Sequence, residues 1–317
     1  MDRRQILAVA SAFAASTLTA ALNAEPISYK ATKLLLVHGR SQQGRQPKDI
    51  RSEWLKALEQ GMGQPLSARV EVALPFYGDV LDNFTRQMQI PLTSEVQSRG
   101  SSAHEEFLVF QAQVAEEIRL QAGITDAQVD AEYGNDPQAR GPLNWKWVQA
   151  ILRAIDKNLP GMNQKSIETF TRDAFLYTTR AGVRDAIDQI VTKEITDQPT
   201  VIVGHSLGSV VTYSILTRDP RSIRVPLYVT VGSPLGIRAI RDQFRPLRRP
   251  PSIIEWYNAF DTRDVVALYP LDLNNFPVQP AIQNNSTVRN KTENRHGISG
   301  YLDDANIAKK IKAALAT

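Results

Sequence analysis

The sequence predicts an α/β fold, in which a mostly parallel sheet is covered by helices on both faces. Two observations favour this class. Short apolar runs typical of buried strands recur along the chain, and they alternate with segments whose apolar residues repeat at helical spacing. The 317 residues, of which 42% are hydrophobic and 22% charged, are also enough for one large core.

Charge and cysteine content exclude several functions. The net charge of +4 is too small and too dispersed to indicate nucleic acid as the partner. The chain contains no cysteine, which rules out disulfides, a thiolate nucleophile and cysteine-based zinc or iron–sulfur sites. Any nucleophile must therefore be an oxygen or an amine.

Residues 1–24 have the layout of a signal peptide. Arg3 and Arg4 precede an uncharged, mildly apolar run rich in Ala, Ser and Thr. The start resembles the twin-arginine export consensus, although Asp2 stands where Ser or Thr is usual. We expect export to the periplasm or the medium by this route, or second by general secretion, with cleavage near Ala24. The alternative is an uncleaved membrane-anchoring helix.

The strands and helices of the predicted core come from two parts of the chain. The run Lys33–Val37 predicts a buried strand, residues 48–60 predict a helix, and alternation over 70–74 predicts a second strand that ends at Pro75. Further strands are predicted at 200–203, 225–231 and 252–258, with a helix after residue 206 and a closing helix around 307–314. Because strands alternate with helices, a parallel sheet is the economical arrangement.

Residues 81–180 interrupt this alternation, because they contain helical stripes and no convincing strand. A segment of that length is too long for a loop in a compact domain. The apolar stripes that predict three helices are Phe107, Phe110, Val114 and Ile118; Val148, Ile151, Leu152 and Ile155; and Ile167, Phe170, Ala174 and Tyr177. We therefore expect a core of residues 25–80 and 181–317 and a helical insertion at 81–180.

The segment Gly204-His205-Ser206-Leu207-Gly208 has the pattern G-x-S-x-G at the junction of a predicted strand and a predicted helix. Glycines at both ends allow a tight turn that pushes the Ser206 hydroxyl out at the carboxyl edge of the sheet. The start of the following helix also favours developing negative charge. Ser206 is the candidate nucleophile, and the alternative is a serine that only caps the helix.

From Lys33 to the C-terminus, apart from the insertion, the chain resembles the α/β-hydrolase superfamily. The resemblance implies the order nucleophile, acid, histidine, each after a successive strand. Asp264 looks like the family's acid, with Asp261 in reserve. His296 is the only one of the four histidines that lies beyond the acid; the others are His38, His104 and His205.

A tetrahedral intermediate also needs two hydrogen-bond donors for its oxyanion. One is expected to be the backbone N–H of Leu207, directly after the nucleophile. The other is expected from the loop His38–Gly44, which resembles the H-G-x-x-x-x-G turn of lipases and esterases, with Arg40 as the residue of choice. This chemistry requires neither a metal nor an organic cofactor.

Segments after neighbouring strands should border the substrate pocket, which gives His38, Phe76, Tyr77 and Pro234 as candidates. The insertion would cover the site as a lid, in which Trp145 and Trp147 either line the pocket or hold the lid together. Five arginines between 238 and 249 either solvate a loop or attract an anionic envelope surface.

These observations predict a secreted serine hydrolase of the lipase/esterase type that acts on a small-molecule or lipid ester. Variants with the same triad would be a thioesterase, an acyltransferase or a peptidase. The alternative from another class is a non-catalytic envelope protein that uses the insertion as a binding surface. The sequence predicts neither the physiological substrate nor the oligomeric state.

Overall fold

The computed structural model describes residues 30–40, 42–90, 92, 102–135, 138–159, 161 and 163–316. The predicted signal peptide, residues 1–24, lies outside these ranges, as does Ser41. Within them, no helix is both long enough and apolar enough to cross a membrane.

One six-stranded sheet forms the centre of the molecule, and all five strand pairs in it are parallel. Its strands, in the order in which they lie side by side, are β2 (Glu71–Ala73), β1 (Lys33–Val37), β3 (Thr200–His205), β4 (Val225–Val231), β5 (Ile253–Ala259) and β6 (Gln283–Asn285). The predicted α/β class is therefore confirmed. The strand order reverses between β1 and β3, and ligands of open α/β sheets bind outside the carboxyl ends of the strands at such a point.

The central strands are apolar because helices cover the sheet on both sides. Every residue of β1 and β4 is buried, as is typical of parallel strands that contact helices on both faces. Strand β6 was not expected, because its three residues are all polar and lie at the edge of the sheet. Apart from β6, the observed strands match the predicted ones to within two residues at each end.

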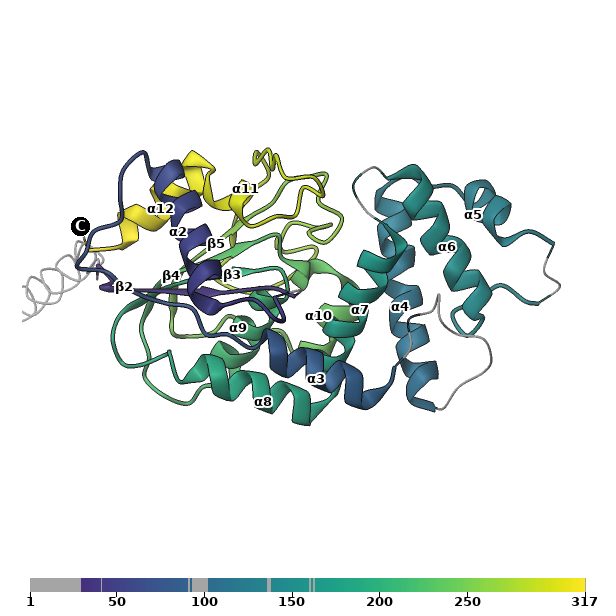
Figure 1. Ribbon diagram of the computed structural model, residues 1–317, viewed down its shortest axis with the longest axis horizontal. Coiled ribbons are helices and arrows are strands. Elements are labelled where there is room, and N and C mark those ends of the chain that lie inside the picture. Colours follow the sequence, from purple (N-terminus) through teal and green to yellow (C-terminus); the bar gives the residue numbers. More distant parts are fainter. Residues whose placement is uncertain are drawn as a thin grey trace, which may run out of the picture.

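Alternate residues along the strands pack against two different sets of helices. One face, with Leu34 and Val203, contacts α2 (Pro47–Met62), α11 (Ser299–Leu302) and α12 (Ala305–Ala314). The other face, with Leu35 and Ile202, contacts α9 (Leu207–Arg218), beside which lie α8 (Ala181–Thr192) and α3 (Gly78–Met88). Figure 1 shows these two layers above and below the sheet.

Four further helices, which we call the helical segment, lie to one side of the sheet (Figure 1). They are α4 (Ser102–Gln121), α5 (Asp126–Tyr133), α6 (Trp145–Asn158) and α7 (Gln164–Thr179). All twelve residues of the three predicted apolar stripes are buried. They join one continuous apolar cluster with Leu35 of the sheet and Val210 of α9.

Helix α3 begins at Gly78 and therefore extends across the boundary predicted at residue 81. The helical segment also touches the core through a polar contact. The Glu117 carboxylate of α4 accepts hydrogen bonds from the main-chain N–H of Arg238, at 3.1 Å to each oxygen, where the short helix α10 (Arg238–Arg241) begins. The helical segment is thus packed directly on the core.

Candidate active site

Ser206 lies on a sharp turn between β3 and α9. Its backbone has φ 52° and ψ −128°, which is an unfavourable region for a residue with a side chain. The glycines on either side leave room for this turn: a Cβ on Gly208 would lie 2.2 Å from the carbonyl oxygen of Val37, and one on Gly204 would lie 2.8 Å from the Cα of Ser209. The G-x-S-x-G pattern therefore has a steric cause at both glycines.

Three of the predicted side chains meet beside this turn. His296 Nε2 lies 2.9 Å from Ser206 Oγ, although the two residues are 90 positions apart, and His296 Nδ1 lies 2.7 Å from Asp264 Oδ2. The carboxylate can only accept, so Nδ1 carries the proton and Nε2 is free to accept the hydrogen of the serine hydroxyl. Ser206 is only 1% exposed and the His296 side chain 14%. We refer to these three residues as the Ser–His–Asp chain.

Asp264 is held by two more donors besides His296. The hydroxyl of Tyr301 donates to Oδ2 at 2.6 Å, and the main-chain N–H of Val266 donates to Oδ1 at 2.9 Å. Burial and then the charge of Asp264 raise the pKa of Tyr301 well above its usual value, so its hydroxyl keeps its proton. The sequence analysis did not single out Tyr301, because a tyrosine five residues after a histidine carries no recognisable signal.

Asp261, the reserve candidate for the acid, has different partners. Arg263 donates to both of its oxygens from Nε and Nη2, and the N–H of Asn290 donates to Oδ2 at 2.8 Å. Burial opposes ionisation of Asp261, but these hydrogen bonds outweigh it and lower the pKa of the carboxyl. In the described part of the chain, Asp264 and not Asp261 contacts His296.

Gly232, at the end of β4, leaves the space in which these groups meet. Its φ is +56°, and a Cβ at this position would lie 3.1 Å from His296 Cε1, 3.1 Å from Tyr301 Cε2 and 3.2 Å from Asp264 Oδ2. The segment containing Gly232 was predicted to border the site, but this steric role was not.

His205 holds the main chain of His296 in place. Its Nε2 lies 2.8 Å from the carbonyl oxygen of His296, and the two rings are 4.8 Å apart. Burial, followed by the proximity of His296, lowers the pKa of His205 well below 6.5, so the ring is neutral and donates one N–H to that carbonyl.

The loop after β1 passes directly beside Ser206. A Cβ on Gly39 would lie 2.7 Å from Ser206 Cβ and 3.3 Å from its Oγ, so the next residue, Arg40, is adjacent to the serine. Among the described residues, neither the N–H of Arg40 nor that of Leu207 has a hydrogen-bond acceptor. The Arg40 side chain turns away to α7, where Nε lies 3.3 Å from the buried carboxylate of Asp173.

The four residues predicted to border the pocket are packed inside the protein to different degrees. His38 and Tyr77 are fully buried and stack at 4.1 Å; Pro234 is buried, and Phe76 is half-buried. His38 Nδ1 contacts the carbonyl oxygen of Gly39 and Nε2 accepts the N–H of Tyr77. Burial lowers the pKa of His38 to about 4, against which the Gly39 contact acts. Their part in substrate binding stays a prediction.

The aromatic and arginine residues of the sequence analysis also have internal partners. Trp147 packs edge-on against Tyr133 at 5.3 Å, and Arg140 lies over its ring, which ties parts of the helical segment together. Arg241 and Arg245 both pair with Asp242. Contact of the 238–249 stretch with an anionic surface stays a prediction.

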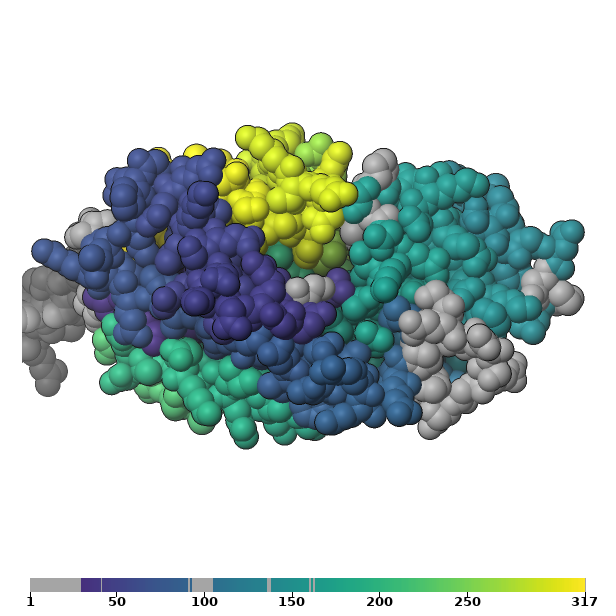
Figure 2. All heavy atoms as spheres, viewed as in Figure 1, coloured from purple at the N-terminus to yellow at the C-terminus, as the bar shows by residue number. Residues whose placement is uncertain are grey.

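A cavity of about 240 Å³ lies beside Asp264, and neither Ser206 nor His296 lines it. It lies between the helical segment and the loops that carry Asp264 and His296, and Asp264, Asn294 and Arg295 form part of its wall. Figure 2 shows the surface hollowed where the yellow C-terminal loops meet the teal helices.

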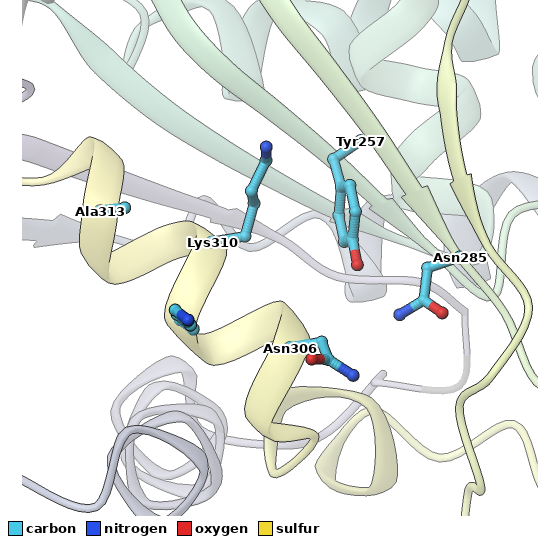
Figure 3. A pocket seen from close by; sticks show the side chains of 6 residues that line it. Tyr257, Asn285, Asn306, Lys310 and Ala313 are labelled. Carbon is cyan, nitrogen blue, oxygen red and sulfur yellow. The ribbon is translucent and has the colours of Figure 1, made fainter.

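A second hollow, of about 410 Å³, lies at the edge of the sheet beside α12 and shares no residue with the Ser–His–Asp chain. Tyr257, Asn285 and Lys310 face it, as Figure 3 shows. The Lys310 amine pairs with Glu255 and is 3.2 Å from Gln283 Oε1, so this charge is already compensated.

Over the described ranges, no three His, Asp or Glu side chains are grouped so that they could hold a metal ion. Comparisons of this chain with protein-family models, with curated proteins and with solved structures find no match. The proposed function therefore rests on the geometry of the site.

Proposed function

We propose that this protein is a serine hydrolase of the α/β-hydrolase superfamily that cleaves carboxylic esters through an acyl-enzyme. The observation that carries the proposal is the pair of contacts made by His296, 2.9 Å to Ser206 Oγ and 2.7 Å to Asp264 Oδ2. A nucleophile, a base within hydrogen-bond reach and a carboxylate that orients the base are the three parts of a catalytic triad, whatever the fold.

In the proposed reaction, Ser206 Oγ attacks the ester carbonyl carbon while its proton moves to His296 Nε2. Asp264 fixes the ring tautomer and stabilises the imidazolium that forms. The ester C–O bond then breaks, and His296 returns the proton to the departing alcohol oxygen. Water then gives a proton to His296 Nε2 and attacks the acyl carbon, the bond from that carbon to Ser206 Oγ breaks, and His296 returns the proton to Oγ as the carboxylic acid leaves.

The oxyanion formed in each step needs donors in a site with little water. The N–H groups of Arg40 and Leu207 are the proposed donors, because Gly39 touches Ser206 and both N–H groups lack acceptors among the residues described. The hydrogen bond from Arg40 Nε to Asp173 then fixes the loop against α7 and so orients the Arg40 main chain.

Two further parts of the proposal concern context. The helical segment acts as the cover of the site, which fits the 1% exposure of Ser206. The enzyme acts outside the cytoplasm, and the predicted signal peptide, residues 1–24, directs its export.

A fluorophosphonate probe tests the proposal, because it reacts with an activated serine. We expect the wild-type protein to be labelled once, and Ser206→Ala to lose both the label and about 10⁶-fold of its activity on p-nitrophenyl esters. Ser52→Ala, an exposed serine on α2, is the matched control and should behave as wild type. Labelling that persists in Ser206→Ala, or folded wild-type protein that is not labelled, would contradict the proposal.

A further inference from the structure

Two buried serines lie beside the turn that carries Ser206 and form a line of hydroxyl groups. Ser209 Oγ lies 2.6 Å from the carbonyl oxygen of Ser206 and 2.7 Å from Ser233 Oγ. Ser233, in the loop after β4, accepts the N–H of Leu235 at 3.3 Å. Both serines are buried, so their hydroxyl groups do not exchange these partners for bulk water.

The partners determine the direction of each hydrogen bond in this line. A hydroxyl has one proton to donate, whereas a carbonyl oxygen can only accept. Ser209 therefore donates its proton to the Ser206 carbonyl oxygen and accepts the proton of Ser233, whose oxygen receives the N–H of Leu235. The line thus leads from the β4 loop to the carbonyl oxygen of the candidate nucleophile. The main-chain N–H of Ser209 donates to that same oxygen at 3.0 Å.

The carbonyl oxygen of Ser206 belongs to the same peptide group as the N–H of Leu207. Because this group is planar and trans, its C=O and N–H point in opposite directions, and a contact that fixes one also fixes the other. The N–H of Leu207 is a proposed oxyanion donor and has no acceptor among the described residues. The hydroxyl of Ser209 therefore sets the direction in which this donor points.

The second proposed donor, the N–H of Arg40, is held in the same way. The carbonyl oxygen of its peptide group belongs to Gly39 and lies 2.6 Å from Nδ1 of His38. Because Nε2 of His38 accepts the N–H of Tyr77, Nδ1 carries the ring proton and donates it to Gly39. In both peptide groups, a buried side chain thus contacts the carbonyl end and directs the N–H end.

We propose that Ser209 is a positioning residue for the hydrolysis, and that its hydroxyl, held by Ser233, aims the N–H of Leu207 at the oxyanion. The inference rests on the proposed function. Ser206 has the unfavourable φ of 52°, and such a conformation persists only where its surroundings fix it. The oxyanion exists only after Ser206 has attacked, so loss of the Ser209 hydroxyl should slow the chemical step and leave substrate binding unchanged.

Ser209→Ala tests this role by steady-state kinetics on p-nitrophenyl butyrate. We expect kcat to fall about tenfold with little change in KM, and the pH–rate profile to keep its position because no titrating group is altered. Ser233→Ala should cause a smaller loss of the same kind. The double variant should lose no more than Ser209→Ala alone, since Ser233 acts through Ser209. Ser214→Ala, which removes another buried hydroxyl of α9, is the matched control and should keep the wild-type kcat.

Inhibition by propyl trifluoromethyl ketone isolates the effect on the oxyanion. This ketone has the acyl group of the butyrate ester. Ser206 Oγ adds to its carbonyl carbon while the serine proton moves to His296 Nε2, and the former carbonyl oxygen becomes an oxyanion. The inhibition constant should therefore rise about tenfold in Ser209→Ala, in step with the fall of kcat, and stay at the wild-type value in Ser214→Ala.

The outcomes separate this inference from the proposed function. An unchanged kcat in folded Ser209→Ala, a loss that Ser214→Ala reproduces, or a fall of kcat without a rise of the inhibition constant would overturn the inference and leave the proposed function intact. Losses that add in the double variant would overturn the part assigned to Ser233. Wild-type protein that neither hydrolyses the ester nor binds the ketone would contradict the proposed function, and this inference with it.

Discussion

The loops at the carboxyl ends of β3, β4 and β5 and the helical segment α4–α7 are built in different ways. The loops contain unusual backbone conformations, such as Ser206 at φ 52° and Gly232 at φ 56°. The polar side chains that meet there are Ser206, His296, Asp264 and Tyr301, which are joined by hydrogen bonds of 2.6–2.9 Å between distant parts of the chain. The helical segment instead buries apolar residues at helical spacing, for example Ile151 and Leu152 of α6.

Because of this difference, the two regions should respond differently to amino-acid substitutions. A hydrogen-bonded group that moves by about an ångström loses its function, because reaction rates depend steeply on geometry. An apolar interface tolerates substitution as long as volume and pattern are kept. We therefore expect changes in the loops to act on the chemical step and changes in the helical segment to act on stability.

After removal of the nucleophile, the largest effect should come from Asp264→Asn, which keeps the shape of the acid but cannot hold the histidine in the tautomer needed. We expect kcat to fall about 10⁴-fold. Asp261→Asn, three positions earlier in the same loop, is the matched variant, and its loss of activity should be far smaller. Steady-state kinetics on one p-nitrophenyl ester measures both, and equal losses would show that the acid is not Asp264.

In the helical segment, Leu152→Ala should lower stability without a comparable loss of activity. Leu152 is fully buried in the apolar cluster, so truncation should reduce the free energy of unfolding by about 2–5 kcal/mol while kcat is retained. Leu143→Ala, at a position 61% exposed, should leave the free energy of unfolding near the wild-type value. Urea denaturation measures the free energy of unfolding of both variants. A loss of kcat in folded Leu152→Ala would contradict the distinction between the two regions.

His38 should make the protein acid-sensitive. Burial disfavours the charged ring in the folded state and lowers the pKa of His38 from 6.5 to about 4, and the neutral ring accepts the N–H of Tyr77. The contribution of the neutral His38 ring to the free energy of unfolding is complete above pH 6.5. As the pH falls from 6.5 toward about 4, this contribution is lost, and the free energy of unfolding decreases by up to about 3 kcal/mol.

His38→Leu tests this dependence. The variant should be less stable than the wild type at neutral pH, and the difference between their free energies of unfolding should shrink as the pH falls through that window. His205 is present in both proteins, and the charge of His38 is the smallest of the influences on its pKa. A difference that does not change with pH would rule out the assigned protonation state.

The smallest effect should come from Tyr301→Phe, which removes one donor to Asp264. We expect kcat/KM to fall about tenfold. The carboxylate then attracts the imidazolium more strongly, so the acidic limb of the pH–rate profile should move to higher pH. Tyr213→Phe, which also loses a buried hydroxyl contact at 3.0 Å but far along α9, should change neither quantity. A lower rate with an unshifted profile would assign Tyr301 a merely structural role.

The sequence was informative where local pattern and local structure coincide. Apolar runs predicted β1, β3 and β4, a more mixed run predicted β5, and the glycines around Ser206 predicted the sharp turn. The sequence could not separate Asp264 from Asp261, because that choice depends on partners such as Tyr301 and Asn290 that lie 37 and 29 residues away. Strand β6 was missed because its pairing with β5 requires no apolar side chains.

Asp261 also anchors the loop that carries the histidine. The N–H of Asn290 donates to Asp261, and the Asn290 side chain donates to the carbonyl oxygen of Gly297 at 2.8 Å, one residue past His296. These hydrogen bonds and the Tyr301–Asp264 contact all join residues that lie between positions 261 and 301. The acid and the histidine are thus linked within residues 261–301, with His205 of β3 as a further support, so a chimera that replaced α4–α7 with foreign helices would retain them as a pair.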